Sequence, residues 1–163
     1  SVSGQGSRFS VEVPLGDPQH LLADETAEPD SALSDLVGLR VMIVDDEISI
    51  REGMHTLLEQ WGCAVIVSGS EDEAVARARE TGSVPEAIIA DYRLRAECTG
   101  VQAIERLRHE FGATIPALII SGDTAAERLR EARSSGYQLV HKPVQPAMLR
   151  TFLRNVRKQQ RKY

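Results

Sequence analysis

The fold is decided by the stretch Val41-Met42-Ile43-Val44-Asp45-Asp46-Glu47, in which four apolar residues end abruptly at three acids. A short apolar run that is rich in β-branched side chains is typical of a fully buried strand in a parallel sheet. Acids directly after such a strand lie at its carboxyl end, where open α/β sheets bind ligands. Adjacent carboxylates repel each other by about 1 kcal/mol in water and by more inside a protein. A hard divalent cation such as Mg²⁺ offsets that repulsion. The alternative is a charged turn with Asp46 as the N-cap of the next helix.

Downstream of this stretch, strand-like apolar runs alternate regularly with segments of helical periodicity. Capping-box patterns open the second and third helical segments. We expect strands at residues 40–44, 64–67, 87–90, 117–120 and 138–141 and helices at residues 48–61, 70–81, 99–111, 124–134 and from 146 onward. Five strand–helix units in succession predict a parallel sheet that is covered by helices on both faces.

The composition limits where the chain acts and what it binds. Its 163 residues suffice for one ordinary domain and a tail. No apolar run approaches the roughly 20 residues that span a bilayer, so we expect no membrane contact from this chain. Cys63 and Cys98 are too few for a disulfide framework and favour a reducing cytoplasm. From Arg150 onward the charged residues are all basic, which we interpret as a solvated helix face rather than a nucleic-acid surface.

The polar residues that follow the strands converge at one edge of the predicted sheet. They are Asp45, Asp46, Asp91, Ser121 and Lys142. Three carboxylates make an oxygen-rich cation site, and a hydroxyl and an ammonium can hold the oxygens of a phosphoryl group. A carboxylate beside Mg²⁺ can also attack phosphorus and form an acyl phosphate. Position alone leaves open which carboxylate is the nucleophile.

Four separated motifs resemble, in order and spacing, those of the receiver domains of two-component response regulators. The motifs are residues 41–47, 87–93, 118–123 and 141–144. The likeness covers about residues 39–158 and implies a flavodoxin-like (βα)5 doubly wound sandwich. Its five-stranded parallel sheet has the order 2-1-3-4-5, which sets the first and third strands side by side.

The resemblance also assigns roles to residues. It implies that Asp91 is the phospho-acceptor, that Ser121 bonds a phosphoryl oxygen and that Lys142 pairs with the phosphate. The implied Mg²⁺ ligands are Asp45, Asp46, Asp91 and the backbone carbonyl of Arg93. A cis Lys142–Pro143 bond and a small residue at Gly122 are implied as well. One departure is Leu139, where receivers often carry Tyr or Phe. Because Leu139 lacks the aromatic ring of the usual aromatic–hydroxyl switch, and Tyr137 lies two places earlier, we expect the output face to respond to phosphorylation differently from that of such receivers.

The residues before the receiver predict a larger parent protein. Residues 4–14 resemble the last glycine box and final strand of a histidine-kinase ATP-binding domain, although a flexible tail is the alternative. We therefore divide the chain into a remnant of that domain at residues 1–15, an acidic linker at 16–38 and the receiver at 39–160. Residues 139–150 resemble receivers that are fused to sensor kinases, so a hybrid sensor histidine kinase fits both ends.

The expected function is to take a phosphoryl group from phosphohistidine onto Asp91 in two-component or phosphorelay signalling. The donor is a histidine kinase, expected in the same parent chain, or a phosphotransfer protein. The chain itself would catalyse only transfer to Asp91 and hydrolysis from it. A free-standing response regulator is the main alternative. A Mg²⁺-dependent phosphatase of the haloacid-dehalogenase kind needs an Asp-x-Asp that residues 45–47 do not supply. A degenerate receiver acting as a binding module is disfavoured by the complete set of site residues.

Overall fold

The computed structural model describes residues 34–95, 98–112, 114–122 and 136–161. Its strands are β1 (Arg40–Val44), β2 (Ala64–Ser68), β3 (Ala87–Asp91), β4 (Ala117–Ser121) and β5 (Gln138–His141). Its helices are α1 (Ile48–Gln60), α2 (Glu71–Thr81), α3 (Gly100–Phe111) and α5 (Pro146–Gln160), preceded by the 3-10 turn η3 (Ser34–Leu36). All predicted strands are confirmed, as are the predicted helices on described residues. The helix predicted at 124–134 lies outside the described residues, as do residues 1–33.

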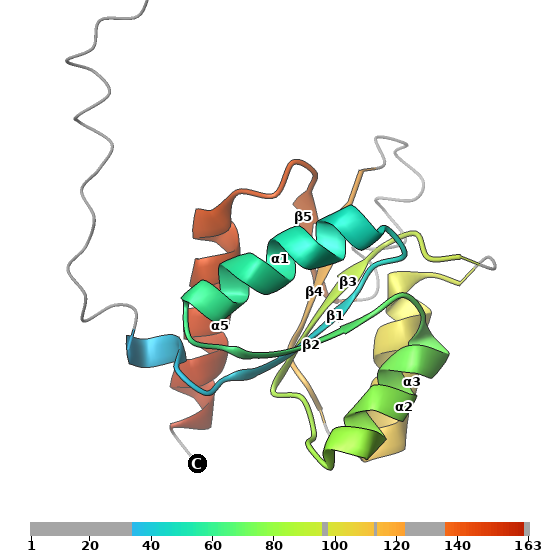
Figure 1. Ribbon diagram of the computed structural model, residues 1–163, viewed down its shortest axis with the longest axis horizontal. Coiled ribbons are helices and arrows are strands. Elements are labelled where there is room, and N and C mark those ends of the chain that lie inside the picture. Colours follow the sequence, from blue (N-terminus) through green and yellow to red (C-terminus); the bar gives the residue numbers. More distant parts are fainter. Residues whose placement is uncertain (1–33, 96–97, 113, 123–135, 162–163) are drawn as a thin grey trace, which may run out of the picture.

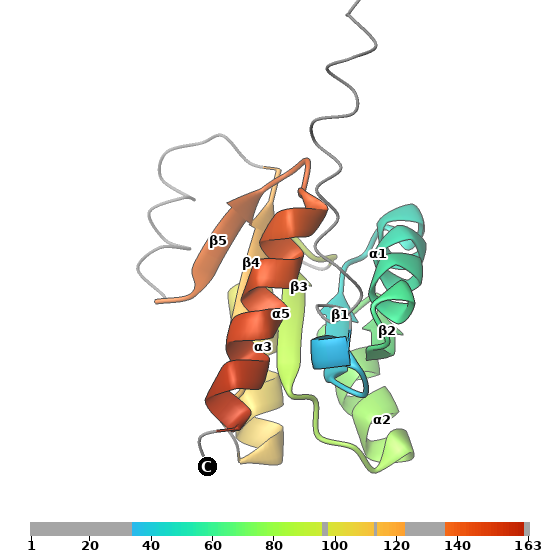
Figure 2. The same ribbon diagram turned by 90° about the vertical axis from the view of Figure 1, so that its left-hand side faces the viewer.

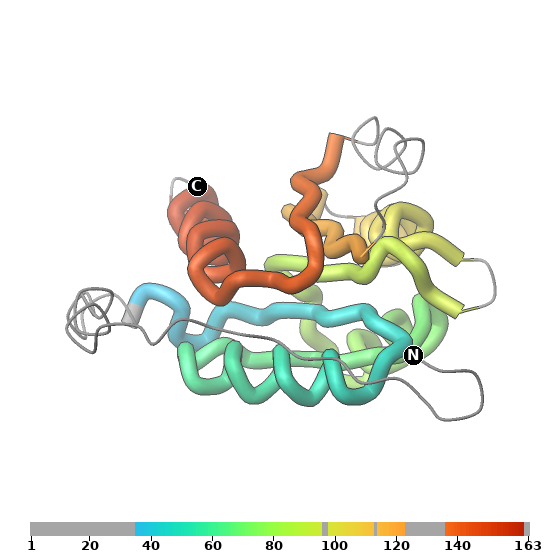
Figure 3. The backbone as a smooth tube through the Cα atoms, turned by 90° about the horizontal axis from the view of Figure 1, so that it is seen from above, coloured from blue at the N-terminus to red at the C-terminus, as the bar shows by residue number. Residues whose placement is uncertain are grey.

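The strands form one parallel sheet in the order β2-β1-β3-β4-β5, as predicted (Figure 1). Successive residues of β1 point to opposite faces of the sheet. Val41 and Ile43 pack with α1 and α5, whereas Met42 and Val44 pack with α2 and α3. Burial on both faces explains why β1 is a continuous apolar run rather than an alternating one. Seen from above, α1 returns alongside β1 (Figure 3). Within the described residues, no helix is long and apolar enough to cross a bilayer.

Side-chain caps fix the starts of α2 and α3. Thr99 and Gln102 form the predicted capping box at α3, in which each side chain accepts a hydrogen bond from the other residue's backbone N–H. At α2 only half of the predicted box forms. Ser70 Oγ accepts from the backbone N–H of Glu73, but the Glu73 carboxylate accepts from Gly69, 2.6 Å away, instead of from Ser70.

The turn η3 packs against the carboxyl-terminal parts of α1 and α5 (Figures 1 and 2). Leu36 and Leu39 are fully buried there. The N–H of Gly38 donates to the carbonyl of Gly62, 2.8 Å away. Asp35 pairs with Arg161, the residue directly after α5, at 3.5 Å. The last residues of the predicted linker, 34–38, are therefore part of the packed structure.

Leu36→Ala should lower the free energy of unfolding by about 3 kcal/mol, because it removes a fully buried side chain and leaves a cavity. Urea denaturation followed by Trp61 fluorescence measures this change. Val37→Ala is the matched control, since Val37 is 57% exposed and its truncation should change stability by no more than about 0.5 kcal/mol. Equal stabilities for the two variants would show that η3 is not part of the folded unit.

Candidate functional site

Polar side chains from four strands meet at the carboxyl edge of the sheet. The parallel register of β1 against β3 sets Asp45 and Asp91 at the same level. Ser121 ends β4, and the backbone N–H of Lys142 donates to the Ser121 carbonyl, 2.9 Å away. The structure thus brings together four of the predicted site residues. It also contains the cis Lys142–Pro143 peptide bond that the resemblance implied.

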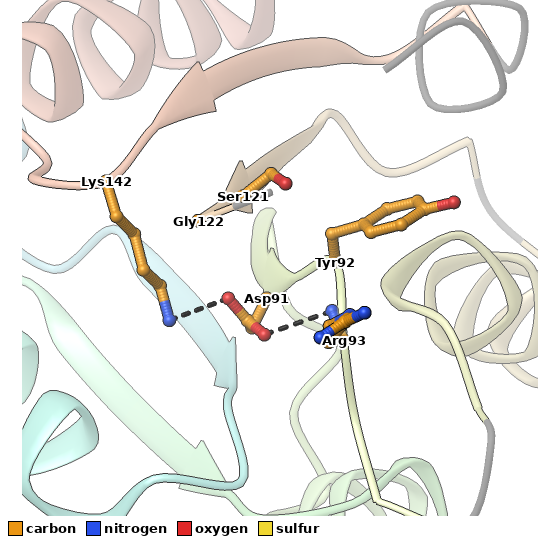
Figure 4. Close-up of a pocket in the computed structure, with 6 residues that line it drawn as sticks. All are labelled: Asp91, Tyr92, Arg93, Ser121, Gly122 and Lys142. Carbon is orange, nitrogen blue, oxygen red and sulfur yellow. Dashed lines mark hydrogen bonds and ion pairs between the residues drawn. The ribbon is translucent and has the colours of Figure 1, made fainter. Parts of the chain in front are cut away.

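A pocket of about 270 Å³ opens at this edge (Figure 4). It is lined by Asp91, Tyr92, Arg93, Ser121, Gly122 and Lys142. Figure 4 shows the Asp91 carboxylate between Lys142 and the backbone of Arg93, with the Ser121 hydroxyl pointing away from that carboxylate. Among the described residues, a Cβ at Gly122 would approach only the Lys142 side chain, at 3.8 Å. The glycine therefore leaves the approach to Asp91 open.

Lys142 bridges the two buried acids. Its Nζ lies 2.7 Å from Asp91 Oδ1 and 3.3 Å from Asp45 Oδ2. Partial burial disfavours the ammonium form, but the hydrogen bond and charge of Asp91, together with Asp45, outweigh burial and raise the pKa of Lys142. The side chain is therefore charged at neutral pH and offsets the repulsion between the two carboxylates.

Asp91 is held at both of its oxygens. Oδ1 faces Lys142, and Oδ2 accepts a hydrogen bond from the backbone N–H of Arg93 at 3.0 Å. Burial raises the pKa of the Asp91 carboxyl, and the neighbouring charge of Asp45 adds to that effect. The Lys142 ammonium and the Arg93 N–H oppose both causes without cancelling them. Asp91 is thus a poorly solvated carboxylate at the floor of an open pocket, where an incoming electrophile can reach it.

The loop between β1 and α1 directs its two aspartates differently. Asp45 Oδ1 accepts from the N–H of Glu47 at 2.9 Å, and Arg51 donates to the Asp45 carbonyl. Asp46 is partly exposed, and its Oδ2 lies 3.3 Å from Nε of Arg95. The N-cap of α1 is Glu47, which makes no side-chain capping bond. The alternative interpretation of Asp46 as the N-cap is therefore wrong.

The donors at this edge fit Mg²⁺ in their chemistry, because carboxylate oxygens are its preferred protein ligands. Asp45 and Asp91 already converge on one cation, the Lys142 ammonium. Among the described residues, no group of three or more His, Cys, Asp or Glu side chains is arranged to hold a metal. Asp46 pairs with Arg95 instead. Two basic side chains thus carry the charge that a divalent cation would supply.

Gly100 is a site residue that the sequence analysis did not single out. It is the first residue of α3, and its N–H donates to the Tyr92 carbonyl at 3.0 Å. A Cβ on Gly100 would lie 2.3 Å from the carbonyl oxygen of Asp91. The start of α3 therefore packs directly on the backbone of the candidate acceptor. The sequence does contain a signal for this role. Glycine is a poor helix former, so a glycine at the first helical position, directly after the N-cap Thr99, indicates a special requirement at that position.

The aromatic side chain before β5 is tied to α3. Arg108 Nη1 donates to the Tyr137 hydroxyl at 3.0 Å, and the guanidinium lies 4.7 Å from the centre of the Tyr137 ring. Leu139 is partly buried against the cluster under α2 and α3. The Tyr137 ring is thus held against Arg108 of α3.

The two cysteines do not offer a competing nucleophile. Burial raises the pKa of the Cys63 thiol to about 11. Burial, together with the hydrogen bond that Cys98 donates to Glu71, raises the pKa of Cys98 to about 11 as well. Both side chains are therefore protonated at neutral pH, and the thiolate is the reactive form.

Comparison with known proteins is consistent with this geometry. A family model described as "Response regulator receiver domain" matches residues 41–154. The transcriptional regulatory protein ZraR of Klebsiella oxytoca is 29% identical over 96 residues, which are 59% of this chain and 21% of that protein. This chain thus matches only about a fifth of the length of that regulator, 21%. The structure of the chemotaxis protein CheY4 of Vibrio cholerae superposes with a TM-score of 0.62 at 28% identity, covering 74% of this chain and 99% of that one.

Proposed function

This chain belongs to the response regulator receiver domain family, whose members accept phosphoryl groups in two-component signalling, and on that basis we propose that Asp91 is its phospho-acceptor. The observation that carries the assignment is the position of Asp91. It is buried at the floor of an open pocket, on the strand next to β1, with Lys142 at 2.7 Å. We further propose that Mg²⁺ binds to Asp45, Asp46, Asp91 and the carbonyl of Arg93.

The surrounding side chains suit phosphoryl transfer to a carboxylate. An Asp91 oxygen bonds to phosphorus while the phosphorus–nitrogen bond of phosphohistidine breaks and the released imidazole takes up a proton. The Lys142 ammonium then pairs with the phosphoryl oxygens, which now carry the negative charge. The Ser121 hydroxyl turns to donate a hydrogen bond to one of those oxygens. The N–H of Arg93 keeps the second Asp91 oxygen in place. Bound Mg²⁺ would supply charge neutralisation, which is most of what phosphoryl transfer requires.

Metal removal and direct site mapping test this proposal. Acetyl phosphate with Mg²⁺ should label the chain, and EDTA should reduce the label to background, because the acids then lose the cation that neutralises the incoming phosphate. Borohydride reduces an aspartyl phosphate to homoserine, so mass spectrometry of the reduced chain should find homoserine at position 91. Replacing EDTA by Mg²⁺-saturated EDTA controls for the chelator itself. Homoserine at another position, or full labelling in EDTA, would overturn the respective assignment.

We also propose that the parent protein is a hybrid sensor histidine kinase with this receiver at residues 39–160. The likeness of residues 4–14 to the end of a kinase ATP-binding domain supports this parent. The phosphohistidine donor would then be the kinase of the same chain or a phosphotransfer protein, and transfer would take place in the cytoplasm without nucleic-acid contact by this domain. Sequencing the gene upstream of Ser1 tests the proposal. It should encode an ATP-binding domain, whereas a start codon just upstream would indicate a free-standing response regulator.

A further inference from the structure

The two loops that border the site are joined by an ion pair between Arg95 and Asp46. Arg95 follows β3, whereas Asp46 follows β1, and the two are far apart in the sequence. Arg95 Nε lies 3.3 Å from Asp46 Oδ2, and its Nη2 donates to the backbone carbonyl of Asp46 at 3.4 Å. One guanidinium therefore contacts both the side chain and the backbone of the same acid.

This contact gives Asp46 a different partner from the other two acids. Lys142 pairs with Asp45 and Asp91. In the proposed mechanism the Lys142 ammonium can exchange the Asp91 carboxylate for the phosphoryl group, because the arriving phosphoryl oxygens carry negative charge. Arg95 instead pairs with Asp46, which is a proposed metal ligand but not the phospho-acceptor. A guanidinium is charged at every accessible pH, so it does not release the carboxylate by losing a proton.

We propose that Arg95 competes with the divalent cation for Asp46 and so lowers the metal affinity of the site. The inference rests on the proposed Mg²⁺ site. To bind Asp46, the metal must displace the guanidinium from the carboxylate, and the positive charge of Arg95 opposes a second cation nearby. The Arg95 side chain is 75% exposed, so water screens the pair and the expected effect is moderate.

Isothermal titration calorimetry with Mg²⁺, and with Mn²⁺ as a second probe, tests the competition without any phosphoryl transfer. Arg95→Gln should bind either metal roughly two- to fivefold more tightly than the unmodified chain, the range expected for losing an exposed ion pair. Arg95→Lys keeps the charge and should stay close to the unmodified chain. Arg77→Gln is the matched control, because it removes the same charge from a pair with Glu73 on α2. It should leave the metal affinity unchanged.

The outcomes separate this inference from the proposed function. If the unmodified chain binds Mg²⁺ and Arg95→Gln binds it equally or more weakly, the competition is overturned while the metal site stands. A gain in affinity for Arg95→Lys as large as that for Arg95→Gln would overturn the role of charge. If neither the unmodified chain nor Arg95→Gln binds either metal, the proposed Mg²⁺ site fails, and the inference fails with it.

Discussion

Asp91→Asn should abolish labelling of the chain by acetyl phosphate and Mg²⁺. The amide has nearly the same shape as the carboxylate and can still accept a hydrogen bond from the N–H of Arg93. It is not a nucleophile toward phosphorus, and it removes one of the negative charges that we expect to hold the metal. Labelling followed by intact-protein mass spectrometry measures the effect, and we expect no detectable phosphorylated species.

The same variant should remain folded. Burial raises the pKa of Asp91 in the folded chain, so the folded state binds more protons than the unfolded state between the ordinary and the raised pKa. In that window stability falls as the pH rises, and at neutral pH the ionised carboxylate destabilises the fold. Asn carries no such charge and leaves Lys142 paired with Asp45, so the variant should remain folded at the labelling temperature, which thermal unfolding at neutral pH measures. Asp72→Asn, an exposed acid on α2, is the control and should be labelled normally. Normal labelling of folded Asp91→Asn would exclude Asp91 as the acceptor.

The sheet and most of the site could be predicted because they depend on local patterns. Val41–Val44 is apolar throughout since both faces of β1 are covered, and such a run identifies a central parallel strand. Residues that follow parallel strands must meet at one edge, so Asp45, Asp91 and Ser121 could be grouped without coordinates. The neighbouring positions of β1 and β3 came from the family resemblance.

What could not be predicted depends on contacts between distant segments. Leu36 is one apolar residue within an acidic stretch, and nothing local indicates that it is buried between α1 and α5. The pair between Arg95 and Asp46 depends on how two loops fold toward each other. At α2, the sequence alone does not tell whether the Glu73 carboxylate accepts a hydrogen bond from Ser70 or from Gly69, and in the structure it accepts from Gly69.

Gly100→Ala should damage both stability and phosphorylation. The added Cβ would lie 2.3 Å from the Asp91 carbonyl oxygen, which is too close for the contact to persist, and 3.2 Å from Ala90 Cβ, which is tight. Neither neighbour is the end of a flexible side chain, and the bond from Gly100 to Tyr92 ties α3 to the strand end. We expect a loss of about 3 kcal/mol in unfolding free energy. The labelling rate should fall by roughly tenfold or more, because the acceptor must shift with its backbone.

For Gly53→Ala, the same chemical change at another position, we expect a gain in stability rather than a loss. Gly53 is in the interior of α1, and a Cβ there would meet no atom of the described residues within 4 Å. Alanine forms helices better than glycine, so Gly53→Ala should gain about 0.5–1 kcal/mol and label at the normal rate with acetyl phosphate. Urea denaturation and labelling of the two variants in parallel separate a steric effect at the acceptor from a general effect of losing a glycine. If Gly100→Ala matched Gly53→Ala in both measurements, the close approach of α3 to Asp91 would not be a requirement of the site.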